Sequence, residues 1–508
     1  MIVVVDFGSQ TANLIERRIR DLGVTTKFLP PEEALEFIKK NRPAGIILSG
    51  GPSSVYDDGS PTIDPDIFKL GIPLLAICYG MQLMMLLDGG QVVSGKKEYG
   101  PAKLRIKNQE LRMTKSLARE FTVWMSHGDE VIAIPPRFEV LGSTDHVPYA
   151  LVANDKDRLY GLLFHPEVEH TEYGDTILKN FVGLTEAKIE KKEINIEEII
   201  EGIRQKVGDA VVIGAVSGGV DSTVAAALTA KAIGRQFYPF YVDNGLMRIG
   251  TTEQVRDIFK HIGVPVDIIE CEKEMLSRLE GVSDPEKKRK IIGGFYIEKF
   301  EEEMHKLQKT GKNVKFLLQG TIYSDVIESK GTRHADKIKS HHNVGGLPEN
   351  MKLDLLEPLR TFYKDEVRAI GSRLELPDEF VWKQVFPGPG YGVRIRGEIT
   401  QDRLIAERMA DKIVMEEITK AGWLRKVYMS FAIMTGAEST AVKGDGRAFS
   451  EVVAVRVIES KDVMTTNWSH LPYEVLQNIS SRIVNEVPHI SRVVYDITTK
   501  PPATMEWE

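Results

Sequence analysis

Residues 210–222 read AVVIGAVSGGVDS, an apolar run followed by a short loop of glycine and serine. The apolar run is typical of a buried parallel strand, and an alanine-rich helical pattern follows it over residues 223–233. The alternation continues with strands at 237–242 and 265–271, a helix at 252–262 between them, and a strand at 314–319. Strands that alternate with helices predict a doubly wound, mostly parallel sheet.

The N-terminal part of the chain shows the same alternation. Apolar runs at 2–5, 45–48, 73–77 and 159–164 predict strands, and residues 11–22 and 31–40 predict helices between them. The charged stretch TEAKIEKKEINIEEIIEGIRQK at 185–206 predicts a linker and then a helix that opens the second unit. The N-terminal segment is therefore a second α/β domain.

The pattern changes again at FPGPGYG, residues 386–392, where proline and glycine interrupt any regular element. Helical patterns then mix with alternating strand-like runs at 451–458 and 491–497. The predicted fold class is α/β, with two doubly wound, mostly parallel-sheet domains followed by a smaller α+β C-terminal domain. The predicted boundaries are 1–189, 190–383 and 384–508, which agrees with about 150 residues per domain for a chain of 508.

Composition narrows the class of protein. The net charge of −7, from 66 basic and 73 acidic residues, gives no reason to expect a nucleic acid as partner. Two cysteines argue against a disulfide framework and favour a reducing compartment. No signal-peptide pattern and no apolar run of about 18 residues is recognisable, so we expect a cytoplasmic protein with no membrane partner.

The first candidate site centres on Cys78, where the strand at 73–77 meets the helical run GMQLMMLL. A thiol at a helix N-terminus experiences the positive end of the helix dipole, which favours the reactive thiolate. His165 follows another strand and is suited to accept the thiol proton, with Glu167 orienting the imidazole. The alternatives are a small buried cysteine and a polar turn at His165-Pro166-Glu167.

Three short motifs together resemble those of the class I glutamine amidotransferases: GGP at 50–52, ICYGMQ at 77–82 and HPE at 165–167. The resemblance implies that Cys78 is the nucleophile of glutamine hydrolysis, with His165 as base and Glu167 as orienting residue. It further implies four oxyanion and glutamine contacts, namely the amides of Gly51 and Tyr79 and the side chains of Gln82 and His127.

The second candidate site is the SGGVDS loop at 217–222. Its glycines let several backbone N–H groups point at one anion, and the following helix N-terminus adds favourable charge. The lysine of a Walker A motif is absent, and the loop is similar to the pyrophosphate-binding loops of enzymes that attack the α-phosphate of ATP. The alternative is a glycine turn that only allows helix and sheet to pack closely.

That resemblance implies a set of ATP contacts: Ser217, Gly218, Gly219, Val220, Asp221, Ser222, Thr223 and Val242. It also implies a Mg²⁺ ion held between Asp221 and the pyrophosphate, since Mg²⁺ prefers one or two carboxylates together with phosphate oxygens. The rival role for Asp221 is a simple stabilising charge at the helix N-terminus. Asp243 ends the next strand, at the sheet edge where ligands of such folds gather.

Further motifs resemble the GMP synthetase family along essentially the whole chain. They are QGTIYSDVIES at 319–329, IKSHHNVGGLPE at 338–349, FPGPGYGVRIRG at 386–397, GDGRAFSEVVAVR at 444–456 and RVVYDITTKPPATMEWE at 492–508. Val385 and Tyr391 depart from the family pattern, where proline and leucine are expected. Lys339, His341 and His342 are predicted to belong to a segment that covers the substrate.

The family resemblance implies glutamine-dependent amination of XMP to GMP, with ATP cleaved to AMP and pyrophosphate through an adenylated XMP, as in de novo guanine nucleotide synthesis. It implies XMP contacts from Arg248, Lys500 and Glu506, and a homodimer formed through the third domain. Two alternatives remain from the sequence: an ATP pyrophosphatase that acts on another metabolite, and a catalytically silent protein that senses purine nucleotides.

Overall fold

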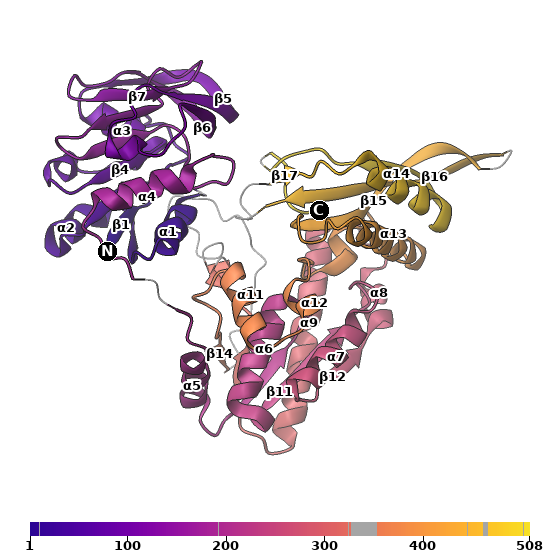
Figure 1. Ribbon diagram of the computed structural model, residues 1–508. Coiled ribbons are helices and arrows are strands. Elements are labelled where there is room, and N and C mark those ends of the chain that lie inside the picture. Colours follow the sequence, from indigo (N-terminus) through magenta and orange to yellow (C-terminus); the bar gives the residue numbers. More distant parts are fainter. Residues whose placement is uncertain are drawn as a thin grey trace. The chain divides into compact units, whose positions relative to one another are not determined.

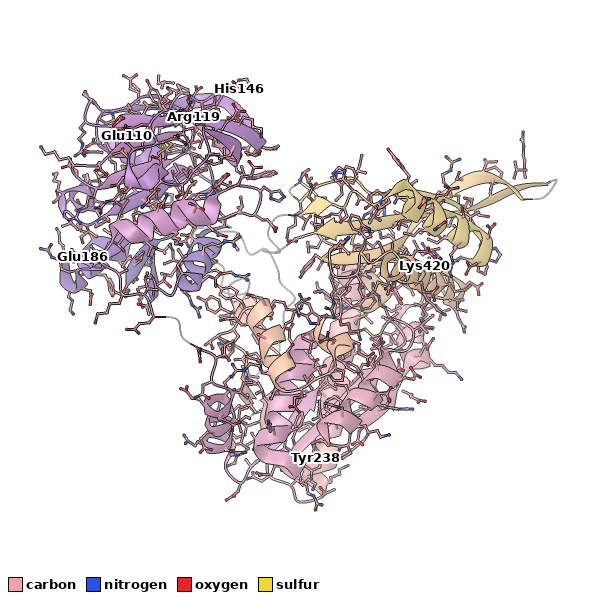
Figure 2. All side chains as sticks on the ribbon, viewed as in Figure 1. Glu110, Arg119, His146, Glu186, Tyr238 and Lys420 are labelled. Carbon is pink, nitrogen blue, oxygen red and sulfur yellow. The ribbon has the colours of Figure 1, made fainter. Side chains whose placement is uncertain are left out.

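The computed structural model describes residues 1–9, 11–190, 193–323, 325–326, 353–443, 446–460, 466–500 and 502–508 (Figure 1). The segment predicted to cover the substrate, with Lys339, His341 and His342, lies outside these residues. The described residues form two compact units, one within Met1–Glu193 and one from Ile194 onward. Polar side chains such as Glu110, Arg119 and His146 lie exposed on the first unit (Figure 2).

The first unit contains a nine-stranded sheet in the order β2-β1-β3-β4-β9-β8-β7-β5-β6. Its parallel part consists of β2 (Thr26–Leu29), β1 (Ile2–Val5), β3 (Gly45–Leu48), β4 (Leu74–Ile77) and β9 (Leu159–Leu162). Four of these strands are buried at every position, as expected for parallel strands covered on both faces.

Helices and an antiparallel arm complete the first unit. The helices are α1 (Ala12–Asp21), α2 (Pro31–Asn41), α3 (Tyr79–Leu87) and α4 (Gly174–Leu184). The arm consists of β5 (Gln91–Ile106), β6 (Glu120–Ala133), β7 (Glu139–Ser143) and β8 (Leu151–Asn154). The arm was not predicted from the sequence.

The second unit begins with α5 (Ile196–Val207) and contains a parallel sheet in the order β12-β11-β10-β13-β14. The strands are β10 (Val211–Ala215), β11 (Phe237–Asp243), β12 (Asp267–Glu270), β13 (Val314–Leu318) and β14 (Asp354–Leu356). The helices are α6 (Val220–Ile233), α7 (Thr251–Ile262), α8 (Glu272–Leu279), α9 (Pro285–Lys309), α11 (Lys364–Arg373) and α12 (Asp378–Val381).

A mixed sheet ends the chain. Its strands are β15 (Met429–Lys443), β16 (Gly446–Glu459), β17 (Asn467–Trp468) and β18 (Ile490–Tyr495), and its helices are α13 (Gln401–Lys420) and α14 (Tyr473–Glu486). β15 pairs with β16 antiparallel, whereas β18 pairs with β16 parallel. The predicted fold class is confirmed.

One hydrophobic cluster joins the parallel sheet of the second unit to the C-terminal segment. It contains Ile213 and Phe240 from the parallel sheet together with Ile413 and Val455 from the C-terminal helix and strand. The segments predicted as separate domains, 190–383 and 384–508, therefore lie within one compact unit, and the three-domain division stays a prediction. None of the helices in the described ranges is both long and apolar enough to cross a bilayer.

Candidate active sites

Cys78 occupies a sharp turn between β4 and α3. Its φ of 49° lies in the left-handed region, which is unusual for a residue other than glycine. The turn is closed by Cys78 N, which donates to Leu162 O at 2.7 Å, and by Gly80 N, which donates to Ser49 O at 3.0 Å. A Cβ at Gly80 would lie 2.7 Å from Leu48 Cβ, so the close approach of α3 to β3 requires glycine.

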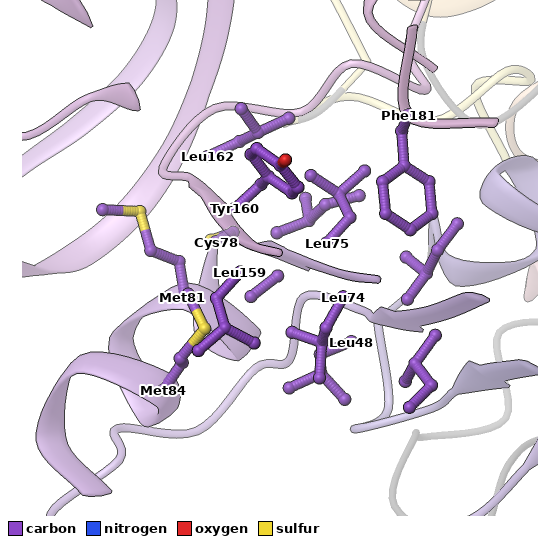
Figure 3. Close-up of a cluster of buried hydrophobic side chains, with 14 of the residues drawn as sticks. Leu48, Leu74, Leu75, Cys78, Met81, Met84, Leu159, Tyr160, Leu162 and Phe181 are labelled. Carbon is purple, nitrogen blue, oxygen red and sulfur yellow. The ribbon is translucent and has the colours of Figure 1, made fainter. Parts of the chain in front are cut away.

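The thiol stands at the edge of the apolar core of the first unit. Cys78 is 4% exposed and belongs to the cluster that also contains Leu75, Met81 and Leu159 (Figure 3). Its Sγ lies 3.5 Å from the backbone oxygen of Ser126, on the antiparallel arm. Burial at a helix N-terminus combines a dry environment with the favourable end of the helix dipole.

His165 and Glu167 complete the predicted triad. His165 Nδ1 lies 2.7 Å from Glu167 Oε1, and both side chains are buried. Burial by itself lowers the pKa of His165, but the Glu167 carboxylate and the Cys78 sulfur outweigh it and raise that pKa well above its usual value. The imidazole therefore holds a proton readily beside the sulfur, as the base of a thiol nucleophile must.

Thr11 is a member of this site that was not predicted from the sequence. Its hydroxyl donates to Glu167 Oε1 at 2.6 Å and lies 2.9 Å from the Ser9 hydroxyl. Thr11 belongs to no recognisable sequence motif. Only the fold brings it to the Glu167 carboxylate, 156 residues further along the chain. Thr11 fixes the carboxylate that orients His165.

The GGP turn at 50–52 packs against His165 and against Tyr79, the residue that follows the nucleophile. A Cβ at Gly50 would lie 3.1 Å from His165 Cε1, and one at Gly51 would lie 2.9 Å from Phe7 O and 3.1 Å from Tyr79 Cγ. Tyr79 is the first residue of α3, where backbone N–H groups have no partner within the helix. Gly51 and Tyr79 are thus neighbours beside Cys78, as an oxyanion site requires.

Gln82 and His127 meet at the backbone oxygen of Asp129. Gln82 Nε2 donates to it at 3.0 Å, and His127 Nδ1 lies 3.0 Å from it. Burial lowers the pKa of His127 and outweighs the nearby Glu98 carboxylate, so the imidazole is neutral at pH 7. The Asp129 carboxylate accepts a hydrogen bond from the Tyr56 hydroxyl at 2.7 Å.

In the second unit, the SGGVDS loop runs from β10 into α6. The helix begins at Val220 with Gly219 as its N-cap, so residues 220–223 form its first turn. Gly218 has a φ of +70°, and the Ser217 and Ser222 hydroxyls lie 3.0 Å apart. The amides of the first turn of α6 have no helical partner and are available to an anion.

Asp221 has one carboxylate oxygen in an ion pair and one without a partner. Its Oδ2 lies 2.6 Å from Lys364 Nζ of α11, whereas the buried Oδ1 has no hydrogen-bond partner among the described residues. A single free carboxylate oxygen beside a phosphate loop fits Mg²⁺, which takes its other ligands from phosphates and water. No group of three or more His, Cys, Asp or Glu side chains suited to a metal occurs in the described part of the chain.

Other backbone segments approach the loop closely. A Cβ at Gly320, after β13, would lie 2.8 Å from Ser222 N. Val242 is buried in β11, next to β10 in the sheet, and Asp243 ends that strand with its Oδ2 accepting from Thr252 Oγ1 at 2.5 Å. The structure therefore gathers the predicted ATP residues at the carboxyl edge of the sheet, where ligands of such folds bind.

The predicted XMP residues Arg248 and Glu506 belong to one buried ionic network. Arg248 Nε lies 2.6 Å from Asp411 Oδ2, and Arg394 binds Glu506 with both nitrogens Nε and NH2, at 3.1 and 3.0 Å. Arg394 NH1 lies 3.6 Å from Asp411 Oδ1 and so links the two pairs. Both arginines stack on the ring of Phe386, in the FPGPG motif.

Lys500 is held by backbone pairing. Its N and O exchange hydrogen bonds of 3.0 Å with Thr466 in an isolated bridge. Arg394, Asp411 and Lys364 were not predicted as site residues, although Arg394 lies within the quoted motif FPGPGYGVRIRG. Asp411 and Lys364 lie on ordinary helical patterns, and only their contacts reveal them.

Comparison with known proteins adds the family evidence. The model of the class I glutamine amidotransferases matches residues 3–184, and that of the GMP synthase C-terminal domain matches residues 416–507. Glutamine-hydrolysing GMP synthases from Ligilactobacillus salivarius and Staphylococcus epidermidis are each 50% identical to the chain, and one from Aquifex aeolicus is 48% identical. Each alignment covers 100% of this chain and 98–99% of the relative.

Proposed function

Since the chain belongs to the family of glutamine-hydrolysing GMP synthases, we propose that it adenylates XMP with ATP and then aminates the intermediate to GMP. The glutamine-dependent synthesis of GMP follows from the family, and the route through AMP and pyrophosphate is our proposal. The observation that supports this route most directly is the SGGVDS loop, which opens a helix and carries no Walker lysine.

In the first unit, the Cys78 sulfur attacks the side-chain amide carbon of glutamine. His165 takes the thiol proton and returns it to the leaving nitrogen, so that ammonia departs and a thioester remains. Glu167, fixed by Thr11, keeps the imidazole in position. The amides of Gly51 and Tyr79 stabilise the oxyanion, and water then hydrolyses the thioester to glutamate.

In the second unit, the amides of residues 218–222 hold the β- and γ-phosphates of ATP. The oxygen at carbon 2 of XMP attacks the α-phosphate, and pyrophosphate leaves. Asp221 would hold a Mg²⁺ ion beside the phosphates, and the ion would supply positive charge that favours this departure. Ammonia then attacks carbon 2, and AMP leaves with the oxygen that came from XMP.

Arg248, Lys500 and Glu506 are proposed to bind XMP. In the structure Arg248 and Glu506 are already engaged with Asp411 and Arg394, and each carboxylate oxygen retains further acceptor capacity. Glu506 is held by a fully buried guanidinium, which suits a rigid acceptor for purine N–H groups. A homodimer and a cytoplasmic location remain predictions from the sequence.

An isotope experiment tests the proposed route. The chain is incubated with glutamine, ATP, Mg²⁺ and XMP that carries ¹⁸O at carbon 2, and the products are analysed by mass spectrometry. We expect equal amounts of GMP, AMP and pyrophosphate, with the label in the phosphate of AMP. ADP and phosphate as products, or unlabelled AMP, would refute adenylation of XMP. A protein that only senses nucleotides gives no product at all.

A further inference from the structure

Lys383 contacts the SGGVDS loop and is not part of the site proposed so far. It follows α12, and its Nζ lies 3.2 Å from Gly218 O and 2.8 Å from Gln254 Oε1 of α7. Both partners are neutral oxygen atoms. An ammonium group has three hydrogens, and these contacts use two of them. One N–H remains for a ligand at the edge of the loop.

The charge of Lys383 is not balanced by an acid in the described part of the chain. Among the residues that the structure describes, no carboxylate forms an ion pair with it, whereas Lys364 and Lys288 each contact one. The charged group that acts on it is Arg248, which is itself paired with Asp411. Lys383 is only partly buried, but an unpaired charge with reduced access to water is costly, so the site favours an incoming anion.

The free ammonium is correspondingly easy to deprotonate. Burial, with a smaller contribution from the positive charge of Arg248, lowers the pKa of Lys383 to about 8. Two observations place Lys383 between the proposed substrate sites. It contacts Gly218 of the loop proposed for pyrophosphate, and it is close enough to Arg248, proposed for XMP, to feel its charge. The phosphate that links these two substrates during adenylation is the α-phosphate of ATP.

We propose that Lys383 is a phosphate ligand of the synthetase site and takes up a proton when ATP binds. This inference rests on the proposed function of the loop. Phosphate oxygens beside Nζ favour the charged form, so the pKa of Lys383 rises on binding. At pH 8 about half of the free chains carry a neutral Lys383, and ATP binding takes up as much as about half a proton per site.

Titration calorimetry measures this uptake directly. Mg-ATP is added to the full chain at pH 8 without XMP, in two buffers with different heats of ionisation. The phosphates of ATP are already ionised at this pH, because their last pKa lies near 6. The wild-type chain is expected to take up about half a proton at pH 8, and the uptake is expected to vanish towards pH 6.5.

Two substitutions isolate the lysine. Lys383→Arg, which stays charged, is expected to bind Mg-ATP without proton uptake. Lys383→Gln is expected to weaken binding roughly 10- to 100-fold, as for the loss of a hydrogen bond to a charged group, and also to abolish the uptake. Lys420→Arg, at an exposed position of α13 (Figure 2), is the matched control and is expected to behave as the wild-type chain.

The outcomes separate this inference from the proposed function. ATP binding by the wild-type chain without proton uptake, or with the same uptake in Lys383→Arg, would overturn the role of Lys383 and leave the loop assignment intact. Failure of the wild-type chain to bind Mg-ATP would contradict the proposed function itself. If Lys383→Arg does not fold, Lys383→Gln takes its place: the same proton uptake in Lys383→Gln as in the wild-type chain would overturn the role of Lys383.

Discussion

Cys78 and Asp221 lie in different compact units, so each can be removed without disturbing the other site. Cys78→Ala is expected to lower glutamine-dependent GMP synthesis by roughly 10⁴-fold or more, because the thioester cannot form without the Cys78 sulfur. Synthesis from added ammonium should remain largely unchanged. Asp221→Ala should abolish synthesis from either nitrogen source. Steady-state assays of GMP formation with glutamine and with ammonium salts check both variants.

These two variants serve as controls for each other. Release of glutamate by Asp221→Ala shows that its first unit is folded, and ammonium-dependent synthesis by Cys78→Ala shows the same for the second unit. Normal glutamine consumption by Cys78→Ala would contradict the assignment of the nucleophile.

A second prediction at the residue scale concerns the proton on His165. Glu167→Gln removes the carboxylate that raises the pKa of His165 and leaves burial, which lowers it. Less imidazolium is then available to stabilise the Cys78 thiolate. Alkylation of Cys78 by iodoacetamide is expected to slow roughly 10- to 100-fold at pH 7, as for loss of a group that orients a histidine. The difference should narrow as the pH rises, because the thiolate then forms without help.

Cys271 provides an internal control for this experiment. Burial raises its pKa to about 11, so it should stay unlabelled at pH 7, and peptide mapping distinguishes the two cysteines. Equal alkylation rates at Cys78 in both proteins would show that Glu167 does not control the imidazole.

The motif residues of both sites could be predicted from the sequence, whereas the residues that contact them could not. Cys78, His165 and Glu167 lie at strand ends, which a pattern of apolar runs reveals, and the structure brings them together. Thr11, Lys364 and Lys383 carry no such signal. Their roles depend on contacts across 156, 143 and 165 residues of chain, which no local pattern encodes.

At the scale of elements, the turn between β4 and α3 tests which of two effects dominates at Gly80. Helix propensity alone predicts that Gly80→Ala stabilises α3 by about 1 kcal/mol. The added Cβ, however, would lie 2.7 Å from Leu48 Cβ and 2.8 Å from Leu48 O. Overpacking against backbone costs about 1–3 kcal/mol or more, so we expect net destabilisation.

The measurement is the midpoint of thermal inactivation of glutaminase activity. The midpoint should fall by roughly 2–4 °C for each kcal/mol of lost stability. Ammonium-dependent synthesis, which takes place in the second unit, is the internal reference and should keep its midpoint. Gly183→Ala in α4 is the matched control, because nothing lies within 4 Å of its added Cβ. This control should be neutral or stabilising by up to about 1 kcal/mol. Equal midpoints for the two variants would refute the steric argument.

Elements with a strong local pattern were predicted closely. β1 and β3 match their predicted ranges, and α7 begins one residue earlier than predicted. The antiparallel arm of β5 to β8 was missed, since β6 alternates buried with partly exposed residues and its long hairpin with β5 is defined by pairing between distant residues. Helix α6 begins inside the SGGVDS loop, at Val220, rather than after it.

At the scale of the molecule, residues 502–508 are anchored by buried cations from elsewhere in the second unit. Arg394 holds Glu506, and the fully buried Lys288 of α9 lies 2.6 Å from Glu508 Oε2. Arg456 donates to the backbone oxygens of Thr504 and Met505. The partners lie up to 220 residues away and could not be deduced from the sequence.

The division into two units leads to a prediction about ammonia. Most free ammonia is protonated at pH 7 and then cannot attack carbon 2, so we expect transfer between the two sites to be sheltered from water. A mixture of Cys78→Ala and Asp221→Ala chains contains one intact site of each kind, but on different chains. Such a mixture should make little GMP from glutamine at pH 7, and more as the pH rises and released ammonia loses its proton.

Added ammonium is the control for the mixture, because it should restore synthesis by the Cys78→Ala chains at once. Glutamate release should proceed throughout, since the Asp221→Ala chains keep the triad of Cys78, His165 and Glu167. Glutamine-dependent synthesis by the mixture at the rate of an equal amount of wild-type chain would mean that ammonia reaches carbon 2 through bulk solvent. In that case the two activities would need no shelter, and their fusion in one chain would require another explanation.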